Sequence, residues 1–210
     1  MRFDLDQVEP GVAYNLLAAT IIPRPIAWVV TKGALGVNAA PFSFFNVMGS
    51  APPTVALGML ADPSRGFKDT AANIVETGEF CINLVPESLV GPMNLTAADA
   101  PRGVNELDIA GVGTLPCQHI APPRITDSPV SFECRLLASV VTGPHQSVVI
   151  GRVLAVHVAD RFVKNPARGH IHTTDLDLVA RSFGSTYVRT QDTFELERPT
   201  WAGLQASRGG

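Results

Sequence analysis

The sequence predicts a mostly β protein, a closed or nearly closed antiparallel barrel with a few short flanking helices. Three observations support this. Glycine and proline are plentiful, at 18 and 17 of 210 residues, and only 17% of the residues are charged. Short apolar segments recur between turn residues, and few segments have a helical period. Because nothing in the composition marks a boundary, residues 1–210 are interpreted as one domain.

The first half of the chain contains three predicted extended segments. Residues 26–31, "IAWVVT", form a strand, and "KGALG" at 32–36 forms the turn that follows it. "VNAAPFSFFNVMG", residues 37–49, is a second extended passage, interrupted by Pro41. "TVALGML" at 54–60 is a third strand. Their order favours consecutive antiparallel pairing.

A short helix is predicted over residues 70–77. Asp69 or Thr70 can cap its start, and Gly78 can end it. "EFCINLV", residues 79–85, returns as a strand. Residues 86–128 are rich in Pro, Gly and Asp and are interpreted as short helical turns and loops.

Two long strands are predicted near residues 130 and 150. "VSFECRLLASVV" at 130–141 has apolar residues at every second position from 130 to 140, which indicates one face in a core. "SVVIGRVLAVHVAD" at 147–160 is apolar on both faces. The second strand is therefore expected to be central in its sheet.

Charge and targeting signals narrow the class of partner. The net charge is −3 and no run of Lys or Arg occurs, so nucleic acid and anionic membranes are poor candidate partners. The start of the chain, "MRFDLDQVEPG", is acidic where a signal peptide would be basic and then apolar. Apolar runs are broken well short of a membrane span. We therefore expect a cytoplasmic protein.

Several familiar sites are not encoded. The chain has no P-loop, no GxSxG, no HExxH and no complete dinucleotide fingerprint. Cys81, Cys117 and Cys134 are odd in number and far apart along the chain, which predicts neither a zinc site nor a disulfide framework. Cys81 and Cys134 are interpreted as inert core thiols. His170 and His172 can share one face of an extended segment, but as loop histidines they need no metal.

Arg24 lies between two prolines in "IIPRPIAWVV". Pro23 and Pro25 fix their own φ angles and favour extended backbone at the residues before them, so Arg24 is held at a sheet edge. One interpretation is a surface arginine that precedes a strand. The alternative is a pre-ordered cation for an anionic phosphate or a partner's carboxylate.

Five segments in close succession give the sequence its strongest resemblance. "PRPIAWVVT", "NAAPFSFFN", the Pro52–Pro53 pair, "RGFKDTAANI" and "GEFCINLV" together resemble the flavin reductase-like family of FMN-binding split barrels. The similarity continues through "SPVSFECRL", "HQSVVIGRVLAVHV" and "ARSFGSTY". This resemblance implies a split β-barrel of Greek-key type and an FMN site. Val30 and "GPHQS" depart from the pattern of the family, in the region expected around a nicotinamide.

The FMN phosphate is expected at "RGFKDT". A chain without a P-loop meets a phosphate with side-chain cations, hydroxyls and free N–H groups at a helix N-terminus. Arg65 and Lys68 supply charge, and Thr70 supplies a hydroxyl beside Asp69 at the start of the helix. The alternative is an ordinary capped helix with exposed basic residues.

The isoalloxazine ring is expected against "NAAPFSFFN". It needs an apolar slot with hydrogen-bonding groups at its pyrimidine edge and N5. Small residues let the backbone approach the ring, and Phe44 and Phe45 either line the slot or belong to the core. With Arg24 at the rim, the remaining candidate cofactor-binding residues are Trp28, Thr31, Asn38, Ala39, Ala40, Pro41, Ser43 and Asn46.

Three functions are compatible with these residues. The first is an NAD(P)H:FMN oxidoreductase that passes hydride to flavin N5. The second is a flavodoxin-like electron carrier with FMN and no site for NADH or NADPH. The third is a binding module that has lost its flavin, which the intact "RGFKDT" and "NAAPFSFFN" disfavour.

An apolar chain with little surface charge predicts a homodimer. The resemblance implies that the flavin lies near the subunit interface, covered by residues 86–128 or by the tail around Arg181 and Tyr187. It also makes a separate flavin-dependent monooxygenase a candidate partner.

Overall fold

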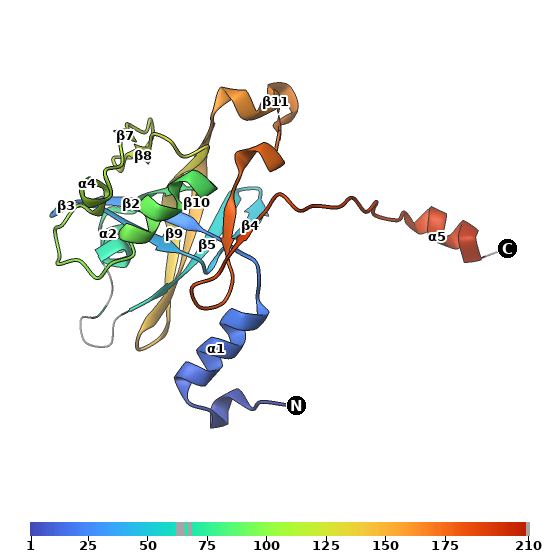
Figure 1. Cartoon of the computed structure of the whole chain (residues 1–210), viewed down its shortest axis with the longest axis horizontal. Coiled ribbons are helices and arrows are strands. Elements are labelled where there is room, and N and C mark those ends of the chain that lie inside the picture. The colour runs from blue at the N-terminus through green and yellow to red at the C-terminus, as the bar shows by residue number, and fades with distance from the viewer. Residues whose placement is uncertain (62–65, 67–68, 209–210) are drawn as a thin grey trace.

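Seven strands form one antiparallel sheet with the spatial order β3-β2-β6-β9-β10-β5-β4 (Figure 1). The computed structural model describes residues 1–61, 66 and 69–208. The bounds of these strands are β2 Ala27–Gly33, β3 Gly36–Phe42, β4 Phe45–Ser50, β5 Pro53–Leu60, β6 Glu79–Asn83, β9 Val130–Gly143 and β10 Gln146–Val158.

The two edge strands of this sheet are neighbours in the sequence. β3 ends at Phe42 and β4 begins at Phe45, so only Ser43 and Phe44 join the two edges. The N–H of Gly58 on β5 donates to the carbonyl oxygen of Phe44 at 2.6 Å. A sheet whose outermost strands are joined by two residues must curl round to bring them together. The structure thus confirms the predicted nearly closed antiparallel barrel.

Three small sheets lie beside the barrel. One contains the strands β1 Arg24–Pro25, β13 Val179–Arg181 and β14 Tyr187–Arg189, and brings the start and the end of the barrel sequence together. The other two are hairpins of β7 Thr114–Leu115 with β8 Arg124–Ile125, and of β11 Val163–Asn165 with β12 His170–Ile171.

The helices are short. The predicted helix is present as α2, Asp69–Thr77, and residues 86–128 contain η2 Glu87–Leu89, α3 Val90–Leu95 and α4 Glu106–Ala110 as expected. None of the helices in the described part of the chain is both long and apolar enough to cross a membrane. The others are α1 Pro10–Thr20, α5 Trp201–Arg208 and the single turns η1 Leu5–Gln7, η3 Asp160–Phe162, η4 Pro166–Arg168 and η5 Thr174–Leu176.

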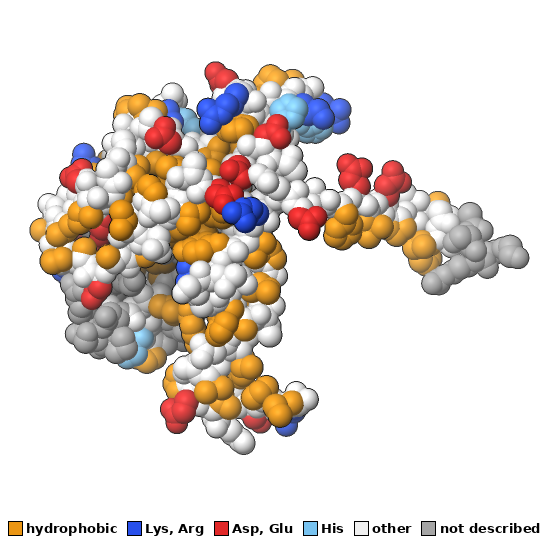
Figure 2. Space-filling view, viewed as in Figure 1, with side chains coloured by type: hydrophobic (Ala, Val, Ile, Leu, Met, Phe, Trp, Pro, Cys, Tyr) orange, Lys and Arg blue, Asp and Glu red, His pale blue; other side chains and the backbone are white. Residues whose placement is uncertain are grey.

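The terminal helices α1 and α5 were not predicted from the sequence, and both project from the barrel (Figure 1). Large apolar side chains are exposed on them and on the tail before α5, including Tyr14, Phe194 and Trp201. Figure 2 shows this tail as a mixture of hydrophobic and acidic side chains. These exposed side chains leave apolar surface that another protein surface can cover.

Two hydrophobic clusters pack on opposite faces of β2 and β6. Val29 and Phe80 belong to the cluster inside the barrel, which α2 covers through Ile74. Trp28 and Cys81 face the other way, into a cluster that α3, α4 and residues 111–128 cover. Because both faces of these strands are buried, residues 86–128 are held firmly over the sheet.

The predicted core face of β9 is confirmed only in its first half. Val130 and Cys134 are buried, but Ala138 and Val140 are exposed. β6 pairs with β9 from Ser131 to Arg135 and no further, so the hairpin of β9 and β10 projects beyond its neighbour. The predicted central position of β10 is confirmed, because it lies between β9 and β5.

Candidate functional site

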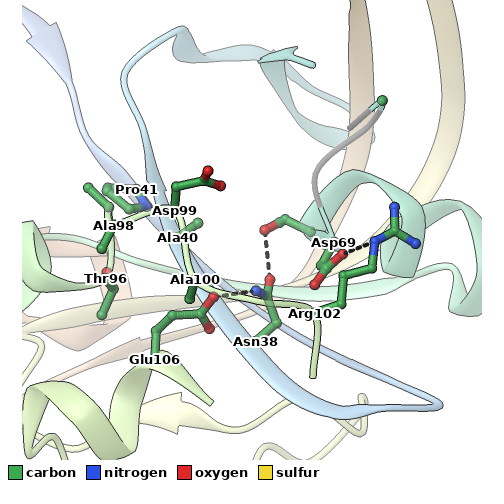
Figure 3. Close-up of a pocket in the computed structure, with 13 residues that line it drawn as sticks. Asn38, Ala40, Pro41, Asp69, Thr96, Ala98, Asp99, Ala100, Arg102 and Glu106 are labelled. Carbon is green, nitrogen blue, oxygen red and sulfur yellow. Dashed lines mark hydrogen bonds and ion pairs between the residues drawn. The ribbon is translucent and has the colours of Figure 1, made fainter. Parts of the chain in front are cut away.

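A pocket opens where β3, the N-terminus of α2, residues 96–100 and α4 meet (Figure 3). It encloses about 680 Å³ and is open to solvent. Ala40, Ala97, Ala98 and Ala100 form part of its wall, together with Pro41. These small side chains let the backbone come close to whatever occupies the pocket.

Asn38 on β3 is the centre of a set of buried polar contacts. Its Nδ2 donates to Oε1 of Glu106 at 2.9 Å, and its Oδ1 accepts from Oγ1 of Thr70 at 2.7 Å. The second carboxylate oxygen of Glu106 accepts the N–H of Ala39 at 2.9 Å. The amide orientation of Asn38 is therefore fixed from two sides, and Glu106 covers the exposed edge of β3.

Two further residues extend these contacts beneath α2. Thr31 Oγ1 donates to Asn38 Oδ1 at 3.4 Å, and Asn73 Nδ2 donates to Thr31 Oγ1 at 3.0 Å. A side chain at Gly33 would collide with the side chain of Asn73, so glycine is needed there. We call Thr31, Asn38, Thr70, Asn73 and Glu106 the pocket network.

Charges of both signs surround the mouth of the pocket. Asp69 and Arg102 form an ion pair with 3.3 Å between Oδ1 and Nε, and the Arg102 side chain is 59% exposed. Asp69 and Thr70 are the first residues of α2, where the helix dipole and unpaired N–H groups favour an anion. An exposed pair of this kind is weak, so Arg102 can exchange Asp69 for an anionic ligand at little cost.

A second cavity of about 930 Å³ adjoins the first, because Pro41 and Ala97 line both. Its wall is more apolar and includes Phe42, Met93 and Tyr187. Together the two cavities have a polar end at α2 and an apolar end at β13 and β14.

Arg24 lies at the edge of a sheet, as predicted, because β1 is the outer strand of its three-stranded sheet. The side chain is buried and lines the second cavity. Nη1 donates to the carbonyl oxygens of Ala18 and Ile21, and Nη2 donates to that of Ser182 at 2.7 Å. These bonds attach the end of α1 and residue 182 to β1, so Arg24 has a structural role. Its contact with a phosphate stays a prediction.

The other predicted cofactor residues fall into four groups. Trp28, Thr31 and Ala39 have no exposed surface, and the indole N–H of Trp28 donates to Thr96 at 2.9 Å, so they support the pocket from behind. Asn46 is exposed on β4 and accepts the N–H of Val47. Arg65 and Lys68 lie outside the described residues. The residues that line a cavity are Asn38, Ala40, Pro41, Ser43, Asp69 and Thr70.

Phe44 and Phe45 have different surroundings. The Phe44 ring lies 6.2 Å from that of Tyr14 and 5.8 Å from the guanidinium of Arg24, so it belongs to the attachment of α1. Phe45 packs against the cluster inside the barrel.

Sequence reasoning missed Glu106 and Arg102, which both line the pocket. Residues 86–128 have no sustained period, so nothing indicated which of their side chains point inward. One signal was present. Asn105 precedes the short α4 and its side chain accepts the N–H of Leu107, which is a helix cap that fixes the place of Glu106.

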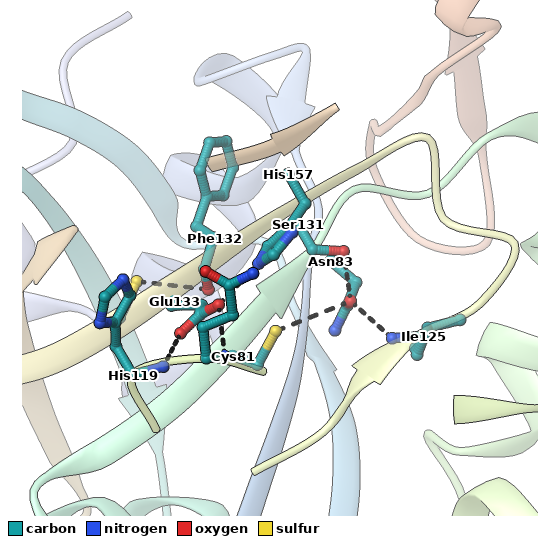
Figure 4. Close-up of polar contacts among 10 residues, drawn as sticks. Cys81, Asn83, His119, Ile125, Ser131, Phe132, Glu133 and His157 are labelled. Atoms are coloured by element: carbon teal, nitrogen blue, oxygen red, sulfur yellow. Dashed lines mark hydrogen bonds and ion pairs between the residues drawn. The ribbon is translucent and has the colours of Figure 1, made fainter. Parts of the chain in front are cut away.

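A second buried carboxylate, Glu133 on β9, lies outside the pocket (Figure 4). It accepts the N–H groups of Gln118 and His119 at 2.9 and 2.6 Å, and His157 Nε2 lies 2.6 Å from its Oε1. We call these contacts the Glu133 clamp. Burial by itself would raise the pKa of the Glu133 carboxyl, but these three hydrogen bonds together hold that pKa below its usual value.

Metal-ligating side chains are scattered over the described part of the structure. Among the described residues, no three His, Cys, Asp or Glu side chains lie close enough together to hold a metal ion. His170 and His172 are both exposed.

Fold and site together define a flavin-related oxidoreductase. The family model described as "Flavin reductase like domain" matches residues 19–175, and the chain belongs to this family. It is 42% identical to an uncharacterized protein of Deinococcus radiodurans, over 97% of this chain and 92% of that protein.

Two solved structures show the same fold. Nitrilotriacetate monooxygenase component B from Bacillus cereus superposes with a TM-score of 0.88, at 30% identity, over 93% of this chain and 98% of that one. A split barrel domain protein from Shewanella frigidimarina superposes with a TM-score of 0.80, at 21% identity, over 95% of this chain and 100% of that one. The predicted split barrel is thus confirmed.

Proposed function

We propose that this protein binds FMN across the two adjoining cavities and catalyses its reduction by NADH or NADPH. The observation that carries the proposal is the pocket network beside the N-terminus of α2, in a chain of the flavin reductase-like family. Both cavities combine apolar walls with a few converging polar groups, which is typical of small-molecule sites.

The polar end fits a phosphate. The N-terminus of α2 offers N–H groups. Arg102 offers a cation, since its exposed ion pair with Asp69 is weak enough to be exchanged for a phosphate. Arg65 and Lys68 are proposed to add charge. Thr70 already donates its hydroxyl hydrogen to Asn38 and is buried, so its contribution to a phosphate is its backbone N–H.

The apolar end fits a flavin ring. Ala40 and Pro41 allow close approach, and Phe42 and Met93 exclude water from the second cavity. Asn38 and Ser43 are the proposed hydrogen-bonding partners for polar atoms of the ring and its chain. Glu106 keeps the amide of Asn38 in one orientation.

FMN, when bound, supplies an acceptor for hydride at N5. The residues of the chain bind and orient it, and they need form no covalent bond with the substrate.

The test is spectroscopic. The purified protein is loaded with FMN, its visible spectrum is recorded, and NADH or NADPH is added without oxygen. We expect the flavin absorbance to bleach with at least one nucleotide. Bound flavin that neither nucleotide bleaches, but that dithionite does, would contradict the reductase and favour the electron carrier.

We also propose a flavin-dependent monooxygenase as the recipient of reduced FMN. The similar protein from Bacillus cereus is, by its name, a component of a monooxygenase. Mixing the reduced protein with such an oxygenase should yield oxygenated product at a rate that depends on both components.

A homodimer is proposed from exposed apolar surface. Leu137, Val140 and Val141 are exposed on the projecting part of β9, and Phe194 and Trp201 on the tail. Burying these side chains between subunits would stabilise the dimer, and a flavin at the interface would stabilise it further. Light scattering across a dilution series, with and without FMN, checks this proposal. A monomer with undiminished FMN affinity would contradict it.

A further inference from the structure

We propose that Cys81 and Cys117 are a thiol pair that hydrogen peroxide oxidises to a disulfide, with Cys117 as the attacking residue. The proposal does not depend on the proposed function. The two residues are 36 positions apart in the sequence (117 − 81), and Cys117 packs against the hydrophobic cluster that contains Cys81.

Cys81 is fixed by the sheet. It lies in β6 with no exposed surface and belongs to the cluster that also contains Trp28 and Met93. Its cross-strand partner on β9 is Glu133, and paired residues in an antiparallel sheet point to the same face. Cys81 and the Glu133 clamp therefore share one side of the sheet.

Cys117 is placed by that clamp. The two residues that follow it, Gln118 and His119, both donate their N–H groups to the carboxylate of Glu133. Cys117 itself is half-buried and packs against the cluster that contains Cys81. The clamp thus places a partly accessible thiol against the cluster that contains an inaccessible one.

The two thiols are chemically different. Their shared hydrogen bond lowers the pKa of Cys117 and raises that of Cys81, and burial raises the latter further. Arg124 lies opposite Leu115 in the β7–β8 pair and also lowers the pKa of Cys117. Its Nε is buried without an acceptor among the described residues, which leaves an N–H for a nearby anion. Cys117 is the thiol that ionises and that peroxide can reach.

The reaction takes two electrons from the pair. The Cys117 thiolate attacks one oxygen of the peroxide, an S–O bond forms, the O–O bond breaks, and the leaving hydroxide takes a proton to become water. The sulfur of Cys81 then attacks the resulting sulfenic acid. An S–S bond forms, the S–O bond breaks, and a second water leaves with the Cys81 proton. Two thiols and one peroxide become one disulfide and two waters.

The disulfide would close a loop of the chain that contains part of the wall of the proposed FMN pocket. Residues 96–100, Arg102 and Glu106 line the pocket and lie between Cys81 and Cys117 in the sequence. A disulfide would join this segment to β6 at both ends. Oxidation is therefore expected to restrict motion of one pocket wall.

The test uses trypsin and mass spectrometry on the full-length protein. Cleavage after Lys68, Arg102, Arg124 and Arg135 places the three cysteines in separate peptides, residues 69–102, 103–124 and 125–135. After treatment of the folded protein with hydrogen peroxide, and before alkylation, we expect a loss of about 2 Da in the intact mass. After alkylation and digestion, we expect a joined peptide of 69–102 with 103–124. Dithiothreitol should separate the two peptides.

Variants identify the attacking thiol. In Cys81→Ala, dimedone should label Cys117 as a sulfenic acid, whereas in Cys117→Ala neither label nor link should form. Cys134→Ala is the matched control, because Cys134 is buried in the other cluster, and it should keep the link. Three alkylatable thiols after peroxide treatment of the wild-type protein, or a link that includes Cys134, would overturn the proposal.

Discussion

Glu106 and Glu133 are both buried carboxylates that accept backbone N–H groups, but their surroundings differ. Glu133 has no exposed surface, and its partners are two N–H groups and His157. Glu106 is 9% exposed, lines the pocket, and its partners are Asn38 and one N–H group. A buried charge is stable only when such bonds replace its lost hydration.

The comparison separates structure from function. The Glu133 carboxylate has no exposed surface and is already bound by three protein groups, and its role is to attach Gln118 and His119 to β9. The pocket network reaches solvent through the pocket, so a ligand can contact it. Substitutions in the clamp should therefore change stability, and substitutions in the network should change ligand binding.

Glu133→Ala should have the largest effect. It removes the charged acceptor that Gln118, His119 and His157 share, which costs about 3 kcal/mol in the free energy of unfolding. Urea denaturation measures the loss. Glu133→Gln, which keeps one acceptor, should lose less, and the FMN affinity of the folded protein should stay within about twofold for both variants. A stable Glu133→Ala protein with weakened FMN binding would contradict the structural role assigned to the Glu133 clamp.

Acid should weaken the same clamp. Because the pKa of Glu133 is lower in the folded protein than in the unfolded chain, its contribution is complete above the unfolded pKa and is lost as the pH falls through the folded pKa. The difference in stability between wild type and Glu133→Gln should therefore be constant near neutral pH and shrink below about pH 4.

Much of the barrel could be predicted from the sequence because its strands carry local signals. Short apolar runs between turn residues located β2, β5, β6 and β10, and Asp69 with Gly78 located α2. The exposure of Val140 could not be predicted, because a strand pattern shows which residues share a face and not where the neighbouring strand ends. Nor did spacing along the chain show that Cys81 and Cys117 meet.

Arg24→Ala should have the second largest effect. Like Glu133, Arg24 is a buried charged residue that attaches neighbouring segments. Its guanidinium donates to the carbonyl oxygens of Ala18, Ile21 and Ser182. We expect a loss of about 2 kcal/mol, measured by urea denaturation, with the ratio of FMN to riboflavin affinity unchanged. Arg24→Lys, which cannot donate in both directions, should be nearly as unstable. A stable variant with selective loss of FMN would instead make Arg24 a phosphate ligand.

Glu106→Ala should mainly affect binding. Water in the pocket can replace the carboxylate as an acceptor, so the stability should fall by only about 1 kcal/mol. The freed amide of Asn38 should lower the affinity for FMN about tenfold, measured by quenching of flavin fluorescence. Ile109→Ala is a control on the exposed side of α4 and should change neither quantity. Unchanged FMN affinity in Glu106→Ala would show that the pocket network does not contribute to FMN binding.

Thr70→Val should give the smallest effect. It removes the hydroxyl that donates to Asn38 Oδ1 but keeps the shape of the side chain and its backbone N–H. We expect a loss of about 1 kcal/mol in stability and a change in FMN affinity smaller than that of Glu106→Ala. A larger loss of FMN binding would show that the hydroxyl itself holds the phosphate.

The candidate site was only partly predictable, for a physical reason. Asn38, Ala40 and Pro41 could be found because they lie on a strand with a recognisable sequence, and Thr70 because it begins a helix. Glu106 and Arg102 come from residues 86–128, whose path depends on packing against Trp28 and Met93 and on no local period. Their positions follow from the tertiary structure alone.

The most direct test of the account is the titration of flavin fluorescence with FMN and with riboflavin, which lacks the phosphate. Wild-type protein should bind FMN at least about tenfold more tightly, and Lys68→Ala with Arg102→Ala, which removes two of the proposed cations, should remove most of that preference while riboflavin binding changes little. Equal affinity of the wild type for the two flavins, or equal loss of both in the double variant, would contradict a phosphate site at the start of α2.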